Sequence, residues 1–385
     1  MHIAWLGKKS PFCGNVTYGR EVTNALLERG YRVSFFHFDP LDAKGDRTAL
    51  NEVSIPCLFK SQIYTIPSPK AGKVLYESLR RLKPDLVHAS LTLSPLDFSL
   101  PDLCAELKIP LVATFHPAFD NKRLNFSSGT QHLTYQVYAP CLSHYGRVIV
   151  FSYIQRDMLI RLGVPKERVA VIPNGVDTEK YFPGFSASRD ALSAKRVFVY
   201  QGRISPEKNL EALLRAWKNC EMGKDCRLIM VGNGPLAPML MSAYGKNLGV
   251  IWKGFVADEA QRIDILRGAD VFVLPSLVEG LSLSLLEAMA CGVACIATDA
   301  GADGEVLSNG SGITLSTHRV STQLETVLPL CRDHPELTAL LGKKARQRAV
   351  ERYTLQQNIS QLERLYQQIA GKQQIYSKYL AETRE

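Results

Sequence analysis

The sequence of 385 residues has no apolar run of the kind that crosses a membrane. Its most apolar windows are broken by Asp270, Glu279 and Glu287 before they reach the roughly 20 residues that a bilayer span needs. The amino terminus also lacks the order of a signal peptide, because the apolar residues 1–7 precede Lys8 and Lys9 instead of following them. We therefore expect a cytoplasmic protein without a membrane-spanning segment.

Common metal and nucleotide motifs are missing as well. None of the nine Cys stands in Cys-x-x-Cys spacing, and the closest pair, Cys291 and Cys295, has no His cluster nearby. This pattern favours reduced, buried thiols over a metal site or a disulfide framework. Neither Gly-x-Gly-x-x-Gly nor Gly-x-x-x-x-Gly-Lys-Ser/Thr occurs, which removes the main support for a dehydrogenase or a P-loop enzyme. No repeat of fixed period and no low-complexity tract is found.

The composition that remains is that of a globular protein, with 46% hydrophobic and 22% charged residues. A chain of this length usually forms about two domains. Its formal net charge of +9 favours an anionic partner, which leaves a phosphorylated ligand, a nucleic acid and an anionic membrane surface open.

Short β-branched or aromatic runs alternate with helical patterns along most of the chain, which predicts the α/β class with mostly parallel sheets. We expect strands at residues 2–6, 32–36, 86–88, 111–115, 148–151, 197–201, 227–231, 250–253, 271–274 and 293–298. A stretch rich in Pro, Asn and Gly at 172–184 interrupts this rhythm and marks a domain boundary. We predict two Rossmann-like domains over 1–178 and 179–354, followed by a helical tail over 355–385 that packs back on the first.

Residues that follow the strands are the candidates for ligand binding, because ligands of open parallel sheets bind beyond the carboxyl ends of the strands. Arg203 and Lys208 follow one predicted strand and together suit a diphosphate. Glu207 beside them is explained by a helix start alone. Gly14 opens a helix whose free N–H groups suit a phosphate, although a plain tight turn explains it equally well. His116 suits a sugar hydroxyl, or else caps a local carbonyl.

Two carboxylates stand eight positions apart after the predicted strand 271–274. Eight helical steps leave Glu279 and Glu287 on different faces, so Glu279 is expected in the loop and Glu287 in the following helix. Held in this way, they could bind two separate sets of sugar hydroxyls. Glu287 has a competing explanation, because Ser284 and Glu287 have the spacing of a helix capping box.

These residues resemble glycosyltransferase family 4, whose members are retaining enzymes of the GT-B fold that use nucleotide-sugars. The resemblance is carried by residues 202–209, by the Glu-x7-Glu segment 279–287 with 288–292 after it, and by 172–177. It implies two Rossmann-like domains that face each other across a cleft. It also implies donor-binding residues, with a catalytic part for His116, Arg203, Lys208 and Glu279; the full set is Gly14, His116, Arg203, Lys208, Gly232, Val256, Glu279, Gly280, Leu281, Ser282 and Glu287.

Within that set, the family pattern assigns particular parts of the donor. Arg203 and Lys208 bind the diphosphate, Glu279 and the backbone of 280–282 lie near the transferred sugar, and Glu287 binds the ribose. His116 is placed beside the donor sugar, and Gly14 lets the backbone approach the phosphates. No Asp-x-Asp occurs, so we expect metal-independent chemistry without a cofactor, in which fixed cations stabilise the departing diphosphate.

The acceptor is less defined by the sequence. Residues 1–178 hold 21 Lys and Arg against 15 Asp and Glu, so most of the excess charge lies in the half that binds the acceptor in this fold. The segment 58–83 mixes basic with apolar residues, which suits either an anionic membrane face or an ordinary solvated helix. Its members are Lys60, Lys70, Lys73, Arg80, Arg81 and Lys83, with Leu58, Phe59, Ile63, Tyr64, Val74, Leu75 and Leu79. Residues 5–14 are also similar to cyanobacterial galactolipid synthases of the digalactosyldiacylglycerol type.

Three functions are therefore weighed. The first is a retaining hexosyltransferase that takes UDP-galactose or UDP-glucose and extends a membrane glycolipid such as a galactosyldiacylglycerol, peripherally bound to the membrane. The second keeps this chemistry but uses a soluble sugar or polysaccharide acceptor. The third is a sugar-nucleotide-binding protein without turnover, against which the presence of His116, Arg203, Lys208 and Glu279 argues. Nucleic acid is not expected as a partner, because the basic residues are dispersed and no recognition motif accompanies them.

Overall fold

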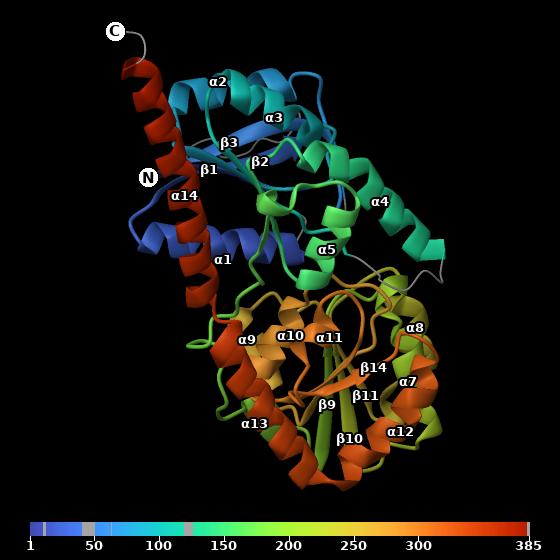
Figure 1. Ribbon diagram of the computed structural model, residues 1–385. Coiled ribbons are helices and arrows are strands. Elements are labelled where there is room, and N and C mark those ends of the chain that lie inside the picture. Colours follow the sequence, from blue (N-terminus) through green and yellow to red (C-terminus); the bar gives the residue numbers. More distant parts are fainter. Residues whose placement is uncertain (11–12, 41–50, 63, 119–125, 383–385) are drawn as a thin grey trace. The chain divides into compact units, whose positions relative to one another are not determined.

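The computed structural model describes residues 1–10, 13–40, 51–62, 64–118 and 126–382, with the side chains of 126–131 and 372–382 left out. The chain forms two compact units (Figure 1). The first comprises residues 1–117, 129–173 and 358–385, and the second comprises 118–128 and 174–357. Ile63, one of the residues considered for the membrane face, lies outside the described residues.

The first unit is built on a sheet of eight described strands in the order β4-β3-β2-β1-β5-β6-β7-β8. All neighbours pair in parallel except β3 and β4, which form an antiparallel edge. The strands are β1 (His2–Gly7), β2 (Arg32–Pro40), β3 (Glu52–Lys60), β4 (Thr65–Pro67), β5 (Leu86–Ser90), β6 (Leu111–Thr114), β7 (Arg147–Val150) and β8 (Val169–Val171). β1 and β5 are buried along their whole length, as expected for central strands covered on both faces.

The described helices of this unit lie between its strands along the chain, apart from the carboxy-terminal helix, which comes after the second unit. They are α1 (Gly14–Glu28), α2 (Ala71–Leu82), α3 (Leu96–Glu106), α4 (Phe126–Leu142), α5 (Tyr153–Arg161) and the carboxy-terminal α14 (Leu355–Glu382), with the short 3₁₀ helix η1 (Lys166–Arg168). α1 ends where the backbone of Gly30 turns to a φ of 81°, and the N–H of Gly30 bonds the carbonyl of Leu27. Gly30, one position after the C-cap residue Arg29, therefore supplies the left-handed backbone that ends the helix.

The helix α14 completes the core of this unit. Ile359, Leu362 and Tyr366 are fully buried, and the Tyr366 hydroxyl lies 2.5 Å from Nδ1 of His88 on β5. Trp5 of β1 stacks on the His88 ring, with the ring centroids 4.1 Å apart. Residues from the beginning and the end of the sequence thus share one core.

The second unit has a parallel sheet of six described strands in the order β11-β10-β9-β12-β13-β14. They are β9 (Arg196–Gln201), β10 (Cys226–Val231), β11 (Val250–Gly254), β12 (Val271–Leu274), β13 (Ala294–Thr298) and β14 (Ile313–Leu315). α7 (Leu210–Asn219), α8 (Ala237–Ala243) and α12 (Val320–Asp333) lie on one side of it, and α9 (Glu259–Arg267), α10 (Leu283–Ala290) and α13 (Pro335–Arg352) on the other (Figure 1). The remaining short helices are α6 (Ala187–Asp190), α11 (Asp303–Val306), η2 (Pro206–Lys208) and η3 (Lys246–Leu248).

The strand predictions are confirmed, since each of the ten expected runs overlaps a strand. Four short or polar strands were not predicted, namely β3, β4, β8 and β14. Segment 58–83 was considered as an anionic membrane face or a solvated helix, and this is wrong for Leu75 and Leu79 of α2, which lie in the core. Residues 58–60 belong to β3 instead of a helix. Within the described ranges, no helix has the length and apolar character needed to span a bilayer.

Candidate functional site

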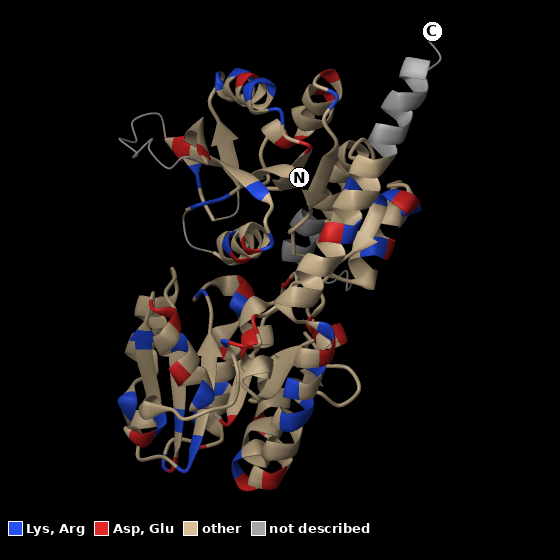
Figure 2. Cartoon of the chain, turned by 90° about the vertical axis from the view of Figure 1, so that its left-hand side faces the viewer, with Lys and Arg blue, Asp and Glu red and all other residues tan. Residues whose placement is uncertain are grey.

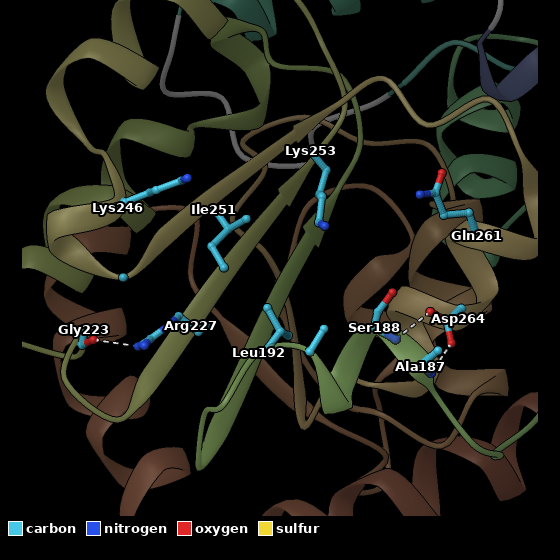
Figure 3. Close-up of a pocket in the computed structure, with 12 residues that line it drawn as sticks. Ala187, Ser188, Leu192, Gly223, Arg227, Lys246, Ile251, Lys253, Gln261 and Asp264 are labelled. Carbon is cyan, nitrogen blue, oxygen red and sulfur yellow. Dashed lines mark hydrogen bonds between the residues drawn. The ribbon is translucent and has the colours of Figure 1, made fainter.

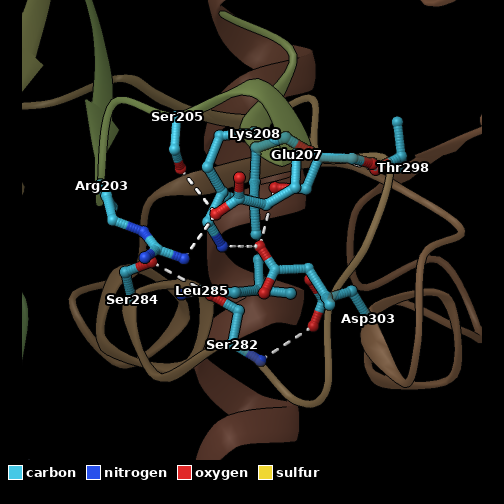
Figure 4. A network of polar contacts seen from close by, with 12 residues as sticks. Arg203, Ser205, Glu207, Lys208, Ser282, Ser284, Leu285, Thr298 and Asp303 are labelled. Carbon is cyan, nitrogen blue, oxygen red and sulfur yellow. Dashed lines mark hydrogen bonds and ion pairs between the residues drawn. The ribbon is translucent and has the colours of Figure 1, made fainter. Parts of the chain in front are cut away.

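Three loops of the second unit converge at the carboxyl edge of its sheet. They follow β9, β12 and β13, which are adjacent strands, and carry residues 202–209, 275–282 and 299–303. The carboxyl edge of a parallel sheet is the usual place for a ligand. Arg203 and Lys208, which the sequence predicted as site residues, lie here (Figure 4). Lys208 forms an ion pair with Glu279, the third predicted residue.

Arg203 is held by its own loop. Its Nη2 lies 2.5 Å from Oε1 of Glu207, and the Ser205 hydroxyl donates to the same oxygen at 2.6 Å. Burial alone would raise the pKa of Glu207, but the Ser205 hydroxyl, the backbone amide and the Arg203 charge hold it below its usual value. The explanation of Glu207 by a helix start alone was therefore incomplete, because its carboxylate fixes the guanidinium.

Lys208 ends the short helix η2 and reaches across to the loop after β12. Its Nζ lies 2.5 Å from Oε1 of Glu279, whose side chain is only 9% exposed, and the Ser276 hydroxyl donates to the same oxygen at 2.7 Å. The backbone N–H of Leu277 also bonds the carbonyl of Glu207, which ties the two loops together. As predicted, Glu279 lies in the loop and not in the helix.

Asp303 is a buried residue of this site that the sequence reasoning missed. Its Oδ1 accepts the backbone N–H of Ser282 at 3.0 Å, while its buried Oδ2 has no partner among the described residues. Burial, followed by the charge of Glu279, raises the pKa of Asp303 well above its ordinary value. The available signal was that Asp303 closely follows the predicted strand 293–298, which corresponds to β13, the neighbour of β12 in the sheet.

The loop after β12 is closely packed against the loop after β13. Gly301 has a φ of 59°, and a Cβ there would come within 2.2 Å of the Glu279 carbonyl oxygen. The N–H of Ala302 bonds the carbonyl of Gly280 at 2.8 Å, and the Asn174 amide donates to the Leu281 carbonyl at 3.1 Å. These contacts fix the backbone of residues 279–282.

Glu287 lies within α10, as predicted, but not as part of a capping box. The helix begins after Ser282, whose hydroxyl accepts the N–H of Leu285 at 3.3 Å, so Ser284 is not the cap. The structural explanation of Glu287 is therefore wrong. Its Oε2 accepts the Gln201 amide at 2.7 Å, and burial raises the pKa of Glu287 to about 7 despite the charge of Arg262.

Gly232 and Val256 follow β10 and β11 and therefore lie toward the same edge of the sheet. Gly232 has a φ of 135°, and a Cβ there would come within 1.8 Å of the Gly202 carbonyl oxygen, so backbone packing alone requires glycine. Val256 is 7% exposed, and its carbonyl accepts Nη1 of Arg262 at 3.1 Å. The structure thus gives both residues a packing role.

His116 and Gly14 belong to the first unit. Nε2 of His116 lies 2.7 Å from the Ser90 hydroxyl, and the ring of Tyr18 packs against it edge-on at 5.2 Å. Burial, with a smaller contribution from the Lys8 charge, lowers the pKa of His116 to about 3, so its imidazole is neutral near pH 7. The alternative in which this side chain caps a local carbonyl finds no such bond in the described structure, and Ser90 is a partner that the sequence did not indicate.

Gly14 begins α1, as predicted. The N-cap position, Cys13, makes no side-chain capping bond. Gly14 does not have a positive φ, and a Cβ at this residue would meet nothing within 4 Å. Neither a tight turn nor local packing therefore requires glycine here. Within the residues that the structure describes, no group of three or more His, Cys, Asp and Glu side chains is arranged to hold a metal ion.

Comparisons with known proteins agree with this arrangement. A sequence model of Glycosyltransferase Family 4 matches residues 14–180, and one of Glycosyl transferases group 1 matches residues 186–348. An Escherichia coli protein named UDP-Gal:alpha-D-GlcNAc-diphosphoundecaprenol alpha-1,3-galactosyltransferase is 27% identical over 81% of this chain and 82% of its own length. The MMP alpha-(1->4)-mannosyltransferase of Mycolicibacterium hassiacum is 31% identical over 58% of this chain and 54% of its own.

Solved structures share the fold. The Anabaena protein HepE in complex with UDP superposes with a TM-score of 0.75 and 19% identity, over 95% of this chain and 99% of the other. Sucrose-phosphate synthase from Thermosynechococcus elongatus gives a TM-score of 0.74 with 21% identity, over 96% and 99%. With its two Rossmann-like units and a family match in each, the chain belongs to the glycosyltransferases of the GT-B fold that resemble family 4 and use nucleotide-sugar donors.

Proposed function

We propose that this glycosyltransferase transfers a hexose from UDP-galactose or UDP-glucose to a membrane glycolipid, with retention of configuration and without a metal ion. The observation that carries the proposal is the cation pair after β9, in which Arg203 and Lys208 are each preorganised by a carboxylate at 2.5 Å. Cations held in place before the reaction stabilise developing negative charge at little reorganisation cost.

The chemistry assigned to the pair follows from where charge develops. When the bond between the anomeric carbon and the phosphate oxygen breaks, the electron pair goes to the nucleoside diphosphate. Arg203 offers a planar fork and Lys208 a point charge to the phosphate oxygens. The departing phosphate takes the proton of the acceptor hydroxyl, which then bonds to the anomeric carbon on the same face.

The remaining residues orient the donor in this proposal. Glu279 accepts hydroxyls of the transferred hexose, and Glu287 accepts the ribose hydroxyls, because each carboxylate has acceptor capacity beyond its present bonds. His116 is neutral, so it can bond a sugar hydroxyl without adding a charge near the reacting carbon. Gly14 leaves open space at the start of α1, which suits an approach by the donor phosphates. The name of the Escherichia coli relative includes UDP-Gal, an α-linkage and a lipid diphosphate acceptor, which supports the choice of donor and acceptor class.

The membrane part of the proposal rests on the edge formed by β3 and β4. Leu58, Phe59, Tyr64 and Ile66 are between 42% and 59% exposed, and the rings of Phe59 and Tyr64 lie 5.6 Å apart. The neighbouring helix α2 packs on β3 and carries the exposed residues Lys73, Arg80 and Arg81. Figure 2 marks the positions of the Lys and Arg residues in blue. Exposed aromatic residues beside basic ones suit an anionic lipid surface, to which each cation adds about 1 kcal/mol.

Activity is tested with labelled UDP-galactose and UDP-glucose on lipid extracts, with and without chelator. We expect an α-linked glycolipid in both conditions and a loss of at least 100-fold in kcat for Lys208→Met, with no change for Lys218→Met, an exposed lysine on α7. An inverted product, or activity that chelation abolishes, would refute the mechanism. Transfer to soluble sugars alone would refute the glycolipid acceptor and favour the second function.

Membrane binding is tested by flotation with vesicles of phosphatidylcholine, with and without phosphatidylglycerol. The double variant Phe59→Ser/Tyr64→Ser should weaken binding to the anionic vesicles about tenfold, because two aromatic rings no longer enter the interface. Phe185→Ser is the matched control, since Phe185 is 76% exposed but belongs to the second unit. Equal binding by both variants would show that this edge does not contact lipid.

A further inference from the structure

A cavity of about 730 Å³ lies in the second unit at the edge strand β11. Figure 3 shows Arg227, Lys246 and Lys253 around it, with Ile251 between them and Leu192 and Ser188 across from them. Its volume is in the range of small-molecule sites. The cavity shares no lining residue with the cluster of Arg203, Lys208 and Glu279.

The edge strand β11 and its neighbour β10 supply both apolar and basic residues to this cavity. Ile251 and Lys253 of β11 line it together with Arg227 of β10. Ile251 pairs with Ile229, and the register shifts beyond Trp252, where Lys253 is the extra residue of β11. Ile251 therefore lies between two cations, with Arg227 toward the start of the paired strands and Lys253 toward their end.

The charges around the cavity are unbalanced. The ammonium groups of Lys246 and Lys253 have no hydrogen-bond or ion-pair partner among the described residues. Arg227 is fixed, because its Nη1 donates to the carbonyls of Gly223 and Cys226 at 3.0 and 2.8 Å. Three cations thus line the cavity, and the apolar residues Ile251 and Leu192, which form its floor, do not balance their charge.

The carboxylate in the lining does not neutralise these cations. Asp264 accepts the N–H groups of Ala187 and Ser188 at 2.8 and 2.9 Å, one with each oxygen. These bonds anchor α6, so Asp264 acts as part of the wall. An anion that enters the cavity therefore meets three cations and a single carboxylate, whose two oxygens already accept backbone N–H groups.

We propose that this cavity binds a phosphorylated metabolite of about the size of a hexose phosphate, at a site separate from the donor site. The phosphate dianion binds at the end of the cavity that carries Lys246 and Arg227, the carbon skeleton covers Ile251 and Leu192, and Lys253 at the other end donates to a hydroxyl of the ligand. Lysine and arginine together recognise a phosphate by charge and by hydrogen bonding. The apolar floor adds affinity that inorganic phosphate alone does not gain.

The site is tested by NMR of the full-length protein labelled at the isoleucine δ1 methyl groups. The Ile251 resonance is assigned as the one that disappears in Ile251→Leu. We expect glucose 1-phosphate to shift this resonance at lower concentration than inorganic phosphate does, and glucose to leave it unchanged. Saturating UDP is present throughout, so that occupation of the donor site does not contribute to the shift.

The double variant Lys246→Gln/Lys253→Gln should raise the Kd for glucose 1-phosphate at least tenfold. Lys343→Gln/Lys344→Gln removes the same charge from exposed positions of α13 and should leave the Kd unchanged. Thermal melts without ligand check that both variants fold. The proposal is overturned if glucose 1-phosphate does not shift Ile251, if glucose shifts it equally, or if the two double variants bind alike.

Discussion

Removing the Lys208 ammonium gives the most direct test of how the two site loops are held. Its partner Glu279 is 9% exposed on the side chain and would keep only the Ser276 hydroxyl, with the Asp303 carboxyl close enough to feel its charge. Removing one partner of a buried ion pair costs about 3–5 kcal/mol. Because Lys208 is 17% exposed and water can reach the site, we expect about 2–3 kcal/mol for Lys208→Met.

The matching change on the other side should cost less. Glu279→Gln keeps an acceptor for Ser276 and removes the negative charge beside Asp303, so we expect about 1 kcal/mol. In the double variant neither charge is left alone, and the total should fall below the sum of the single effects by about 1–2 kcal/mol. A coupling energy of this size between the two substitutions is what we expect if Lys208 and Glu279 form an ion pair.

The assay is urea unfolding followed by tryptophan emission. Trp217 and Trp252 belong to the second unit and report its unfolding, whereas Trp5 belongs to the first. Lys218→Met is the control for loss of a lysine and should change the free energy of unfolding by less than about 0.5 kcal/mol. Strictly additive single effects, or a Lys208→Met variant as stable as the control, would refute the reasoning.

Three further predictions concern other parts of the site. Ribose hydroxyls that donate to Glu287 favour its ionised form, so binding of UDP-hexose should lower the pKa of about 7 and release a proton at pH 7. Glu287→Gln should abolish this proton release, which is measured by calorimetry in buffers of different ionisation enthalpy. Since this pKa is raised from 4.5, the Glu287 contribution to stability is greatest at low pH and is lost as the pH rises through 7, so Glu287→Gln should flatten that part of the stability profile. Ser90→Ala should lower kcat about five- to tenfold and leave the donor KM within a factor of two, because His116 loses the hydrogen bond that orients its ring. Ser90→Thr keeps the hydroxyl and should restore kcat. An unchanged kcat in Ser90→Ala would show that Ser90 does not position His116. Gly301→Ala should destabilise the second unit by roughly 2–4 kcal/mol in the same urea assay, because the new Cβ meets a backbone carbonyl. Gly254 has a φ of 66° but open space around it, so Gly254→Ala should cost only about 1 kcal/mol. Equal costs for the two variants would contradict the packing argument.

Much of the second unit could be predicted from the sequence because buried parallel strands appear as short runs of β-branched residues. β9, β12 and β13 are such runs, and the polar residues after them supplied Arg203 and Glu279. The two strands β3 and β4 at the edge of the first sheet were not predicted. The sequence of β3 includes polar residues and a proline, and β4 has only three residues. Local pattern does not reveal an edge strand that is only half buried.

The errors in the site have a common physical origin, since each depended on a contact between residues distant in sequence. Ser284 had the spacing of a cap, but Asp303 binds the N–H of Ser282 and helps to fix the helix start two residues earlier. Ser90 and His116 meet because β5 and β6 are neighbours, a pairing that no local pattern states. The spacing of residues along the chain thus predicted which loops form the candidate site, but not which of their side chains are in contact.

The burial of α14 in the first unit has a consequence for biosynthesis. Ile359, Leu362 and Tyr366 are fully buried in this unit, with Tyr366 against His88 of β5, so its core is incomplete until α14 has left the ribosome. Residues 174–357 form one continuous stretch that emerges before α14 does. They can fold while the amino-terminal part of the first unit still lacks α14. The domain that is translated first is therefore the one that matures last, and a nascent chain that stalls before α14 would expose the unfilled core to chaperones and proteases.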